Sequence, residues 1–235
     1  MTEKKIKSFI DKLNKDRANG LFFLRPLSNK VEYAIVWSSK PKPTDECDTI
    51  DYYPEKFYFI KNDNGIYVGA ILIMSEDLHW YILPQYRKLG HLTNAMKSTI
   101  LFHLFQEKDE QKITIDKNSI GAKKYDASRN VALNLGFIEN NKKDISEFVL
   151  KSDDYKSDDC FLGLNTELTE ERFQELKKQL HYLSRSLLLI QNEIEIKTGY
   201  SDYSYELKDL VKEIRPTGQF ESVYWKNKRE INEKD

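Results

Sequence analysis

Residues 76–93 read EDLHWYILPQYRKLGHLT, and this stretch decides the expected fold of the domain around it. Its first part, Leu78–Leu83, is rich in aromatic and aliphatic residues and is predicted to be a β-strand. Pro84 ends that strand, because proline has no N–H to donate to a sheet. A helix is predicted over residues 90–107, where apolar side chains recur at three- and four-residue steps.

The junction between this strand and this helix has the features of an anion site. The first N–H groups of a helix have no partner within the helix, and the helix dipole adds roughly half a positive charge there. Arg87 and Lys88 lie beside the junction and can add charge-assisted contacts. Gly90 permits close approach and an unusual backbone angle. The segment therefore predicts a phosphate site, with an ordinary strand-to-helix turn beside two solvated cations as the open alternative.

Outward from this segment, the pattern predicts an α/β or α+β domain with a central sheet. A helix over residues 3–17 places its apolar residues on one side among lysines, and two strand-like runs around Asn64-Gly65 predict a hairpin. Residues 38–54 contain three prolines and are expected to form a loop. The other predicted elements are strands at Leu21–Leu24, Val31–Trp37 and Lys112–Ile115 and a helix over residues 122–135.

The character of the sequence changes after about residue 150, so we expect a first domain over 1–150 and a helical extension over 151–235. Apolar residues recur at alternating three- and four-residue steps from 173 to 194, a heptad pattern that predicts a long helix over 169–198. A shorter helix is predicted over 203–214. The apolar stripe could pack in a helical hairpin, dock on the first domain, or pair with a second copy as a homodimer, and the sequence leaves these alternatives open.

Composition limits the classes of partner. The formal net charge of the 235 residues is −1, whereas domains that bind nucleic acid non-specifically are usually strongly basic. No apolar run approaches the roughly 20 residues that span a membrane, and the lysine-rich start lacks the apolar core of a signal peptide. The two cysteines, Cys47 and Cys160, have no metal-like spacing. We therefore expect a cytoplasmic protein that needs neither a metal, a membrane nor a nucleic acid.

Two motifs, in this order, resemble the GNAT superfamily of acetyl-CoA-dependent N-acetyltransferases. The first is Arg87-x-x-Gly90-x-Leu92, which resembles the family's pyrophosphate loop R-x-x-G-x-G or R-x-x-G-x-A, with leucine at the third position. The second is Ser128–Phe137 (SRNVALNLGF), which resembles the family's late helix S-x-x-V-x-x-x-L-G-F. The resemblance covers roughly residues 20–140 and does not account for the helical extension.

The resemblance implies an α+β fold with a GNAT-like mixed, twisted sheet flanked by helices. Two strands of that sheet would splay apart, and the pantetheine arm of acetyl-CoA would lie between them. Acetyl-CoA would be the acyl donor, an amine the acceptor, and no metal would take part. The cofactor-binding residues that the resemblance implies are Ile82 and Leu83 in the strand, Arg87, Lys88, Leu89, Gly90, His91, Leu92 and Thr93 in the loop, and Asn118 and Ser128 further on.

Transfer of an acetyl group to an amine benefits from a base, because at pH 7 only about one lysine-type ammonium in 10³ carries a free lone pair. Glu76 and Asp77 are the candidates, because the resemblance places a catalytic carboxylate near the start of the strand before the loop. His79 is a third candidate, although a histidine in a strand is more typical of packing. The resemblance places a tyrosine that acts as the general acid at the position of Ala132, and Tyr125 is the candidate that could take over this role.

Two functions follow from these patterns. The first is an N-acetyltransferase that moves an acetyl group from acetyl-CoA to a primary amine of a small molecule, peptide or protein. The alternative is a catalytically silent acyl-CoA-binding or protein-interaction module on the same fold. Glu76, Asp77 and Arg87 favour the enzyme, whereas Leu92 and Ala132 favour the silent module.

Overall fold

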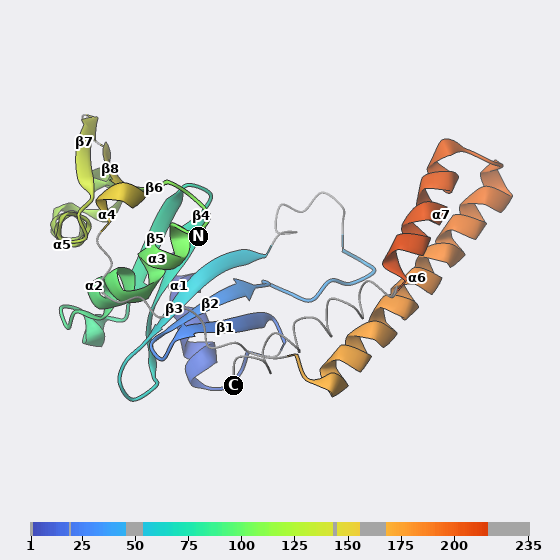
Figure 1. The fold of residues 1–235 in the computed structure, drawn as a ribbon, viewed down its shortest axis with the longest axis horizontal. Helices are drawn as coiled ribbons and strands as arrows, with labels where there is room; N and C mark the ends of the chain where they lie inside the picture. Colours follow the sequence, from blue (N-terminus) through green and yellow to red (C-terminus); the bar gives the residue numbers. More distant parts are fainter. Residues whose placement is uncertain (1, 19, 46–53, 143–144, 156–167, 216–235) are drawn as a thin grey trace. The chain divides into compact units, whose positions relative to one another are not determined.

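The computed structural model describes residues 2–18, 20–45, 54–142, 145–155 and 168–215. The chain divides into two compact units, residues 1–164 and 165–235, which are described separately (Figure 1). Across the described residues, no helix combines the length and the apolar character that crossing a membrane requires.

The first unit contains a five-stranded antiparallel sheet in which the strands follow one another in chain order. Its strands are β1 (Phe22–Ser28), β2 (Val31–Val36), β3 (Glu55–Lys61), β4 (Tyr67–Met74) and β5 (Asp77–Ile82). The predicted hairpin around Asn64-Gly65 joins β3 to β4. Asn62 fixes its turn, because the Asn62 side-chain oxygen accepts the N–H groups of Asn64 and Ile66, each at 3.0 Å.

A second antiparallel sheet follows, with the strand order β6-β8-β7. It consists of β6 (Glu110–Asp116), β7 (Ile138–Lys142) and β8 (Ile145–Lys151). The sequence analysis predicted β6 but neither β7 nor β8. In β7 two consecutive asparagines and a lysine weaken the strand pattern, and β8 is apolar on one face only, through residues such as Phe148 and Leu150.

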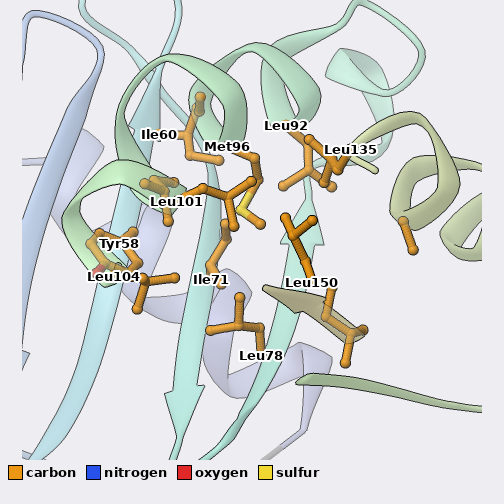
Figure 2. Close-up of a cluster of buried hydrophobic side chains, with 14 of the residues drawn as sticks. Tyr58, Ile60, Ile71, Leu78, Leu92, Met96, Leu101, Leu104, Leu135 and Leu150 are labelled. Atoms are coloured by element: carbon orange, nitrogen blue, oxygen red, sulfur yellow. The ribbon is translucent and has the colours of Figure 1, made fainter. Parts of the chain in front are cut away.

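Helices cover both faces of the first sheet. Helix α1 (Glu3–Asn14) packs its four buried apolar residues on one face, against an aromatic cluster that includes Phe57 and Phe59. The opposite face is covered by a continuous helical segment made of α2 (His91–Ala95), a π-helical turn (Met96–Ile100) and α3 (Leu101–Leu104). Figure 2 shows Met96 and Leu101 of this segment above Ile71 of the sheet.

The same core continues into the second sheet. Helices α4 (Lys117–Ile120) and α5 (Ala122–Asn134) follow β6, and Leu135 and Leu150 join the cluster beneath α2 (Figure 2). The predicted α+β class is therefore confirmed, with all described strand pairings antiparallel.

The second unit contains the predicted C-terminal helices, α6 (Glu170–Thr198) and α7 (Asp202–Ile214). Thr169 caps α6 by accepting the N–H of Arg172 at 3.2 Å, and Ser201 and Ser204 form a reciprocal capping box on α7. Gly199, with φ of 80°, ends α6 and begins the short turn to α7.

Candidate functional site

Strands β5 and β6 belong to different sheets, and the hydrogen bonds that join them in the described residues lie at their starts. The Lys112 N–H donates to the Glu76 carbonyl at 3.4 Å, and the Thr114 N–H donates to Asp77 Oδ1 at 2.9 Å. Residue numbers rise together on the two segments, from Glu76 with Lys112 to Asp77 with Thr114, so β5 and β6 run in the same direction. No strand ladder joins them in the described part of the chain, and no backbone hydrogen bond links them beyond Asp77 among the described residues.

The edge of β5 that faces β6 carries free backbone groups. The Leu83 N–H donates to the Val68 carbonyl at 2.9 Å, which fixes the alternation of the β4–β5 ladder. Backbone groups alternate between the two sides of a strand, so those of Leu78, Trp80 and Ile82 point away from β4. Arg87 Nε donates to the Ile82 carbonyl at 2.9 Å. Among the described residues, the N–H and carbonyl of Trp80 and the N–H of Ile82 therefore have no partner and can bind a ligand.

Ile82 and Leu83, the two strand residues expected to contact acetyl-CoA, differ in whether their backbone groups are free. The N–H of Leu83 binds Val68, and its carbonyl accepts the Tyr86 N–H at 2.9 Å, so both backbone groups already have partners. Ile82 keeps its N–H. Trp80, which the sequence analysis did not single out, offers both of its groups.

The loop after β5 presents a row of unpaired amides. A short 3₁₀ turn, Pro84–Tyr86, leads into Lys88 and Gly90, which have φ angles of 64° and 78°. Arg87 and Lys88 form a tight turn that directs the Leu89 N–H back toward the preceding 3₁₀ turn. Within the described residues, the backbone N–H groups of residues 90–93 have no acceptor, and the first amide of the helix to bond back is that of Asn94, which donates to the Gly90 carbonyl at 2.9 Å. This is the arrangement expected for an anion site at a helix start.

Leu92 does not obstruct this loop. Its side chain is only 9% exposed, and Figure 2 shows it directed toward Leu135 in the core. The departure from a small residue at this position therefore fills the interior, and the Leu92 N–H stays on the loop. Leu89, by contrast, is 62% exposed.

The two cations at the loop differ in what they contact. The Arg87 guanidinium lies 5.6 Å from the centroid of the Tyr81 ring and binds the Ile82 carbonyl, so it is turned back toward β5. Lys88 is exposed and has no ion-pair partner among the described residues. His91 packs edge-on to Tyr86, with ring centroids 6.1 Å apart. Lys88 is thus the cation that is free to meet an incoming anion.

Asn118 lies at the end of β6 that corresponds to the loop end of β5, because the two strands run in the same direction. The Asp116 carboxylate holds this turn by accepting the hydroxyl of Ser119 and, at 2.9 Å, the N–H of Asn118. The bond from Ser119, followed by that from Asn118, holds the pKa of Asp116 below its usual value. The Asn118 side chain is exposed, whereas Ser128 is half-buried on α5.

The two carboxylates expected as bases have different roles in the fold. Asp77 Oδ1 accepts the N–H of its neighbour Leu78 at 2.7 Å as well as that of Thr114, so it links the two sheets. The Glu76 side chain is 77% exposed in the β4–β5 turn and contacts Lys112 at 3.5 Å. Neither carboxylate lies at the loop end of β5, since the strand rises about 3.3 Å per residue and Pro84 follows seven residues after Asp77.

His79 lies on β5 between these carboxylates and the loop. Its Nε2 is buried and has no hydrogen-bond partner in the described part of the molecule. Burial is the main cause that lowers the pKa of His79 below its ordinary value. The imidazole is therefore neutral at pH 7 and keeps a lone pair.

Tyr125 is not brought together with Glu76 or Asp77. Its hydroxyl lies 2.7 Å from Ser146 Oγ and donates to Glu139 Oε1 at 3.3 Å, which directs it toward the β7–β8 hairpin. Arg129 binds the same Glu139 carboxylate at 2.7 Å. Tyr125 thus anchors α5 to the second sheet.

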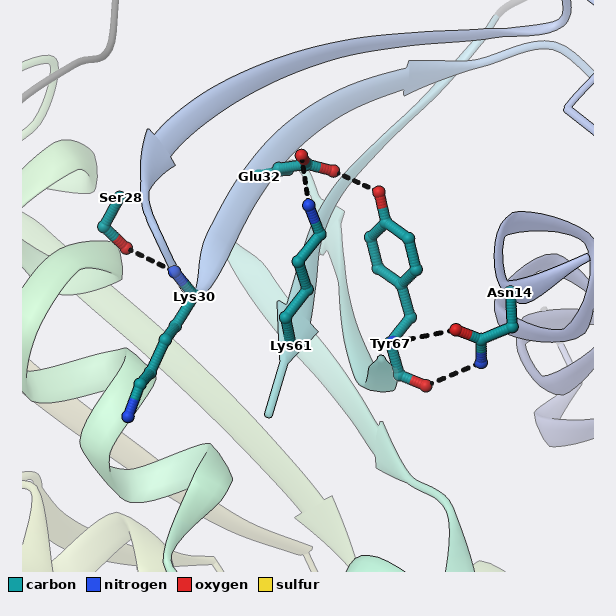
Figure 3. Close-up of polar contacts among 6 residues, drawn as sticks. All are labelled: Asn14, Ser28, Lys30, Glu32, Lys61 and Tyr67. Carbon is teal, nitrogen blue, oxygen red and sulfur yellow. Dashed lines mark hydrogen bonds and ion pairs between the residues drawn. The ribbon is translucent and has the colours of Figure 1, made fainter. Parts of the chain in front are cut away.

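Two polar networks elsewhere in the first unit were missed by the sequence analysis. His103 Nε2 accepts from Arg25 at 2.8 Å, and its Nδ1 lies 2.8 Å from the buried Tyr58 hydroxyl. In the other network, the nearly buried Glu32 binds Lys61 at 2.6 Å and the Tyr67 hydroxyl (Figure 3). The available signal was a charged residue, Glu32, at an inward position of a strand between apolar neighbours.

No family model matches the chain, and no curated protein matches its sequence. The structure resembles solved acetyltransferases. One is a mutant form of the spermidine/spermine N-acetyltransferase SpeG from Vibrio cholerae, with a TM-score of 0.36 and 11% identity, covering 43% of this chain and 69% of that one. Another, from Acinetobacter baylyi ADP1 and named as an acetyltransferase, has a TM-score of 0.33 and 20% identity, covering 45% of this chain and 69% of that one.

Proposed function

We propose that this chain is an N-acetyltransferase that binds acetyl-CoA at the β5–α2 loop and acetylates a primary amine. The observation that supports this most is the combination of two features at one place. The N–H groups of residues 90–93 have no acceptor among the described residues, and they follow a strand whose edge toward β6 forms no ladder there.

The chemical types of the residues at this place suit acetyl-CoA. The pyrophosphate of a coenzyme is an anion, and the free amides of residues 90–93 at a helix start, with the unpaired Lys88 beside them, suit an anion. The pantetheine arm contains amides, which can pair with the free N–H and carbonyl of Trp80 and the N–H of Ile82. Asn118 offers a further exposed amide at the matching end of β6. When bound, acetyl-CoA would supply the activated acetyl group.

His79 is the base that the surroundings support best. An amine acceptor must lose a proton to attack, and a neutral imidazole with a free lone pair can take it, directly or through water. Burial lowers the pKa of His79 and leaves its Nε2 without a partner. Asp77 already accepts two N–H groups, and Glu76 lies in the exposed turn. A backbone N–H on the open edge of β5 can stabilise the developing oxyanion.

A silent acyl-CoA-binding module is the second candidate. One observation favours it: the hydroxyl of Tyr125, the expected acid, is bonded to Ser146 and Glu139 on the β7–β8 hairpin. In that case the site would bind the coenzyme without turnover.

The test is thiol release from acetyl-CoA, followed over a panel of polyamines, aminoglycosides and peptides with lysine or free α-amino groups. The wild type should release thiol with at least one class of amine. The variant Gly90→Asp, which puts a carboxylate among the free amides, should lose both coenzyme binding and turnover. His79→Gln should keep binding and lose most of the turnover, with the acidic limb of its pH profile altered.

The control is Lys56→Glu, an exposed charge change on β3, at the end of the sheet away from the loop. It should match the wild type in binding and rate. Coenzyme binding without turnover on any amine would favour the silent module, and absence of binding would exclude both candidates.

A further inference from the structure

The second unit is a helical hairpin whose two helices meet through small and polar residues. The Ser184 hydroxyl donates to the Val211 carbonyl of α7 at 3.0 Å, and Ser184, Gln191, Ser204 and Val211 are all buried. This seam joins α6 and α7 in antiparallel fashion, with the short turn at Gly199 between them (Figure 1). The fully buried positions of the seam therefore lie beside the long heptad stripe of α6, of which Leu183 and Ile190 stay exposed.

That stripe lies on one flank of the hairpin. At about 100° per residue, the run from Leu176 to Ile194 is centred roughly a quarter turn from the seam marked by Ser184 and Gln191. On α7 a second apolar run, Tyr203, Leu207, Leu210 and Ile214, is also displaced roughly a quarter turn from its seam, in the same rotational sense. Because the helices are antiparallel, both runs fall on the same side of the hairpin. Together they form one continuous surface, here called the apolar flank.

The apolar flank is left open by the hairpin itself. Leu183 and Ile190 of α6 are 53% and 52% exposed, and Tyr203 and Leu210 of α7 are 60% and 43% exposed. The other members of both runs are only half-buried. Monomeric proteins rarely expose a continuous apolar surface of this size.

The shape of the flank indicates another helical layer as its partner. Alternating three- and four-residue spacing suits helix-on-helix packing, and two helices with one shared apolar side are half of a four-helix bundle. In the described part of the first unit, the large exposed apolar side chains lie singly on separate elements, such as Phe23, Ile66 and Leu89. A second copy brings an identical flank, and a two-fold axis makes such a contact self-complementary.

The size of the flank is adequate for this role. Leu176 to Ile194 spans about 27 Å of helix, and the pair of helices is about 20 Å wide. A footprint on the order of 500 Å² per copy buries about 1,000 Å² in total, which is the threshold for a biological interface and above the roughly 800 Å² of most crystal contacts.

We infer that the α6–α7 hairpin is a dimerisation module, in which the apolar flanks of two copies pack together as an antiparallel four-helix bundle. This inference is independent of the transferase chemistry proposed for the first unit.

The test is the mass of the full chain in solution, measured by sedimentation from 1 to 100 μM. The wild type should sediment as a dimer, twice the 27.8 kDa of one chain. Leu183→Glu with Ile190→Glu, which places two charges in the flank, should sediment as a monomer at concentrations at least 100-fold above the wild-type midpoint. A wild type that stays monomeric at 100 μM would overturn the inference and leave the flank to the first unit.

The chain supplies a matched control. Leu189 and Ile196 have the same residue types and the same seven-residue spacing, but they lie on the opposite side of α6 and are 72% and 86% exposed. Leu189→Glu with Ile196→Glu should remain a dimer. Equal behaviour of the two double variants would contradict the inference. Leu210→Glu on α7 provides a second route if the first double variant loses helical circular dichroism, and a dimer that survives Leu210→Glu would also count against it.

Discussion

Asp77 holds the first sheet to the second, and this role can be separated from a catalytic one. Its Oδ1 accepts the N–H groups of Leu78 at 2.7 Å and Thr114 at 2.9 Å. Hydrogen bonds to a charged group contribute about 1.5–3 kcal/mol each, and the exposed Thr114 can regain part of its bond from water. Asp77→Ala should therefore lower the free energy of unfolding by about 2–4 kcal/mol.

The measurement is urea unfolding followed by the fluorescence of Trp80, which lies on β5 and can be isolated by replacing Trp37 and Trp225 in the background. Hydrogen exchange at the Thr114 amide should accelerate in the same variant. Asp77→Asn keeps an oxygen in the accepting position, so it should retain stability to within about 1 kcal/mol and retain acetyl transfer. Glu76→Ala, which removes an exposed side chain, should cost under about 0.5 kcal/mol. An Asp77→Ala protein as stable as the wild type would refute the linking role, and a stable but inactive Asp77→Asn would show instead that this carboxylate is the base.

Three further predictions test the first unit, two on its polar networks and one on Leu92 at the loop. His103 is half-buried and accepts a hydrogen bond from Arg25, and its burial, followed by the charge of Arg25, lowers its pKa in the folded protein. The unfolded chain therefore binds more protons than the folded one just below pH 6.5, so the stability that His103 contributes should be full above that pH and fall as the pH drops toward the folded pKa. His103→Gln should reduce this fall in thermal melts from pH 5 to 8. Leu92→Ala should lower the free energy of unfolding by about 2–4 kcal/mol while acetyl-CoA binding persists at low temperature, because its side chain lies in the core and its N–H remains. Lys61→Met should cost about 2–4 kcal/mol in urea unfolding, since it leaves the nearly buried Glu32 carboxylate without its cation; equal stability would show that Tyr67 alone satisfies it.

Much of the first unit could be predicted from local patterns. The hairpin at Asn64-Gly65 and the junction at Gly90 are encoded by neighbouring residues, since turn chemistry and helix starts act over a few positions. The helix predicted over 90–107 ends at Leu104, and the pattern gave no sign of its π-helical turn at Met96–Ile100.

Long-range pairings could not be predicted in the same way. The register of β5 on β4 decides which backbone groups of β5 point away from β4. That the groups of Trp80 are unbonded and those of Leu83 are bonded therefore follows only from the register. Tyr125 has a spacing that suits an acid, yet its partner Ser146 lies 21 residues away on a strand that the pattern did not predict. The heptad stripe of α6 left its partner open, and the structure places small and polar residues such as Ser184 at the fully buried centre of the α6–α7 seam.

The most direct test of the central claim is calorimetric titration with acetyl-CoA of the wild type, Lys88→Glu and Lys56→Glu. Lys88 is the unpaired cation beside the free amides, and Lys56 carries the same charge change at the other end of the sheet. The account predicts micromolar binding by the wild type and by Lys56→Glu, and binding at least tenfold weaker by Lys88→Glu. No binding by the wild type, or equal weakening by both variants, would contradict an acyl-donor site at residues 88–93.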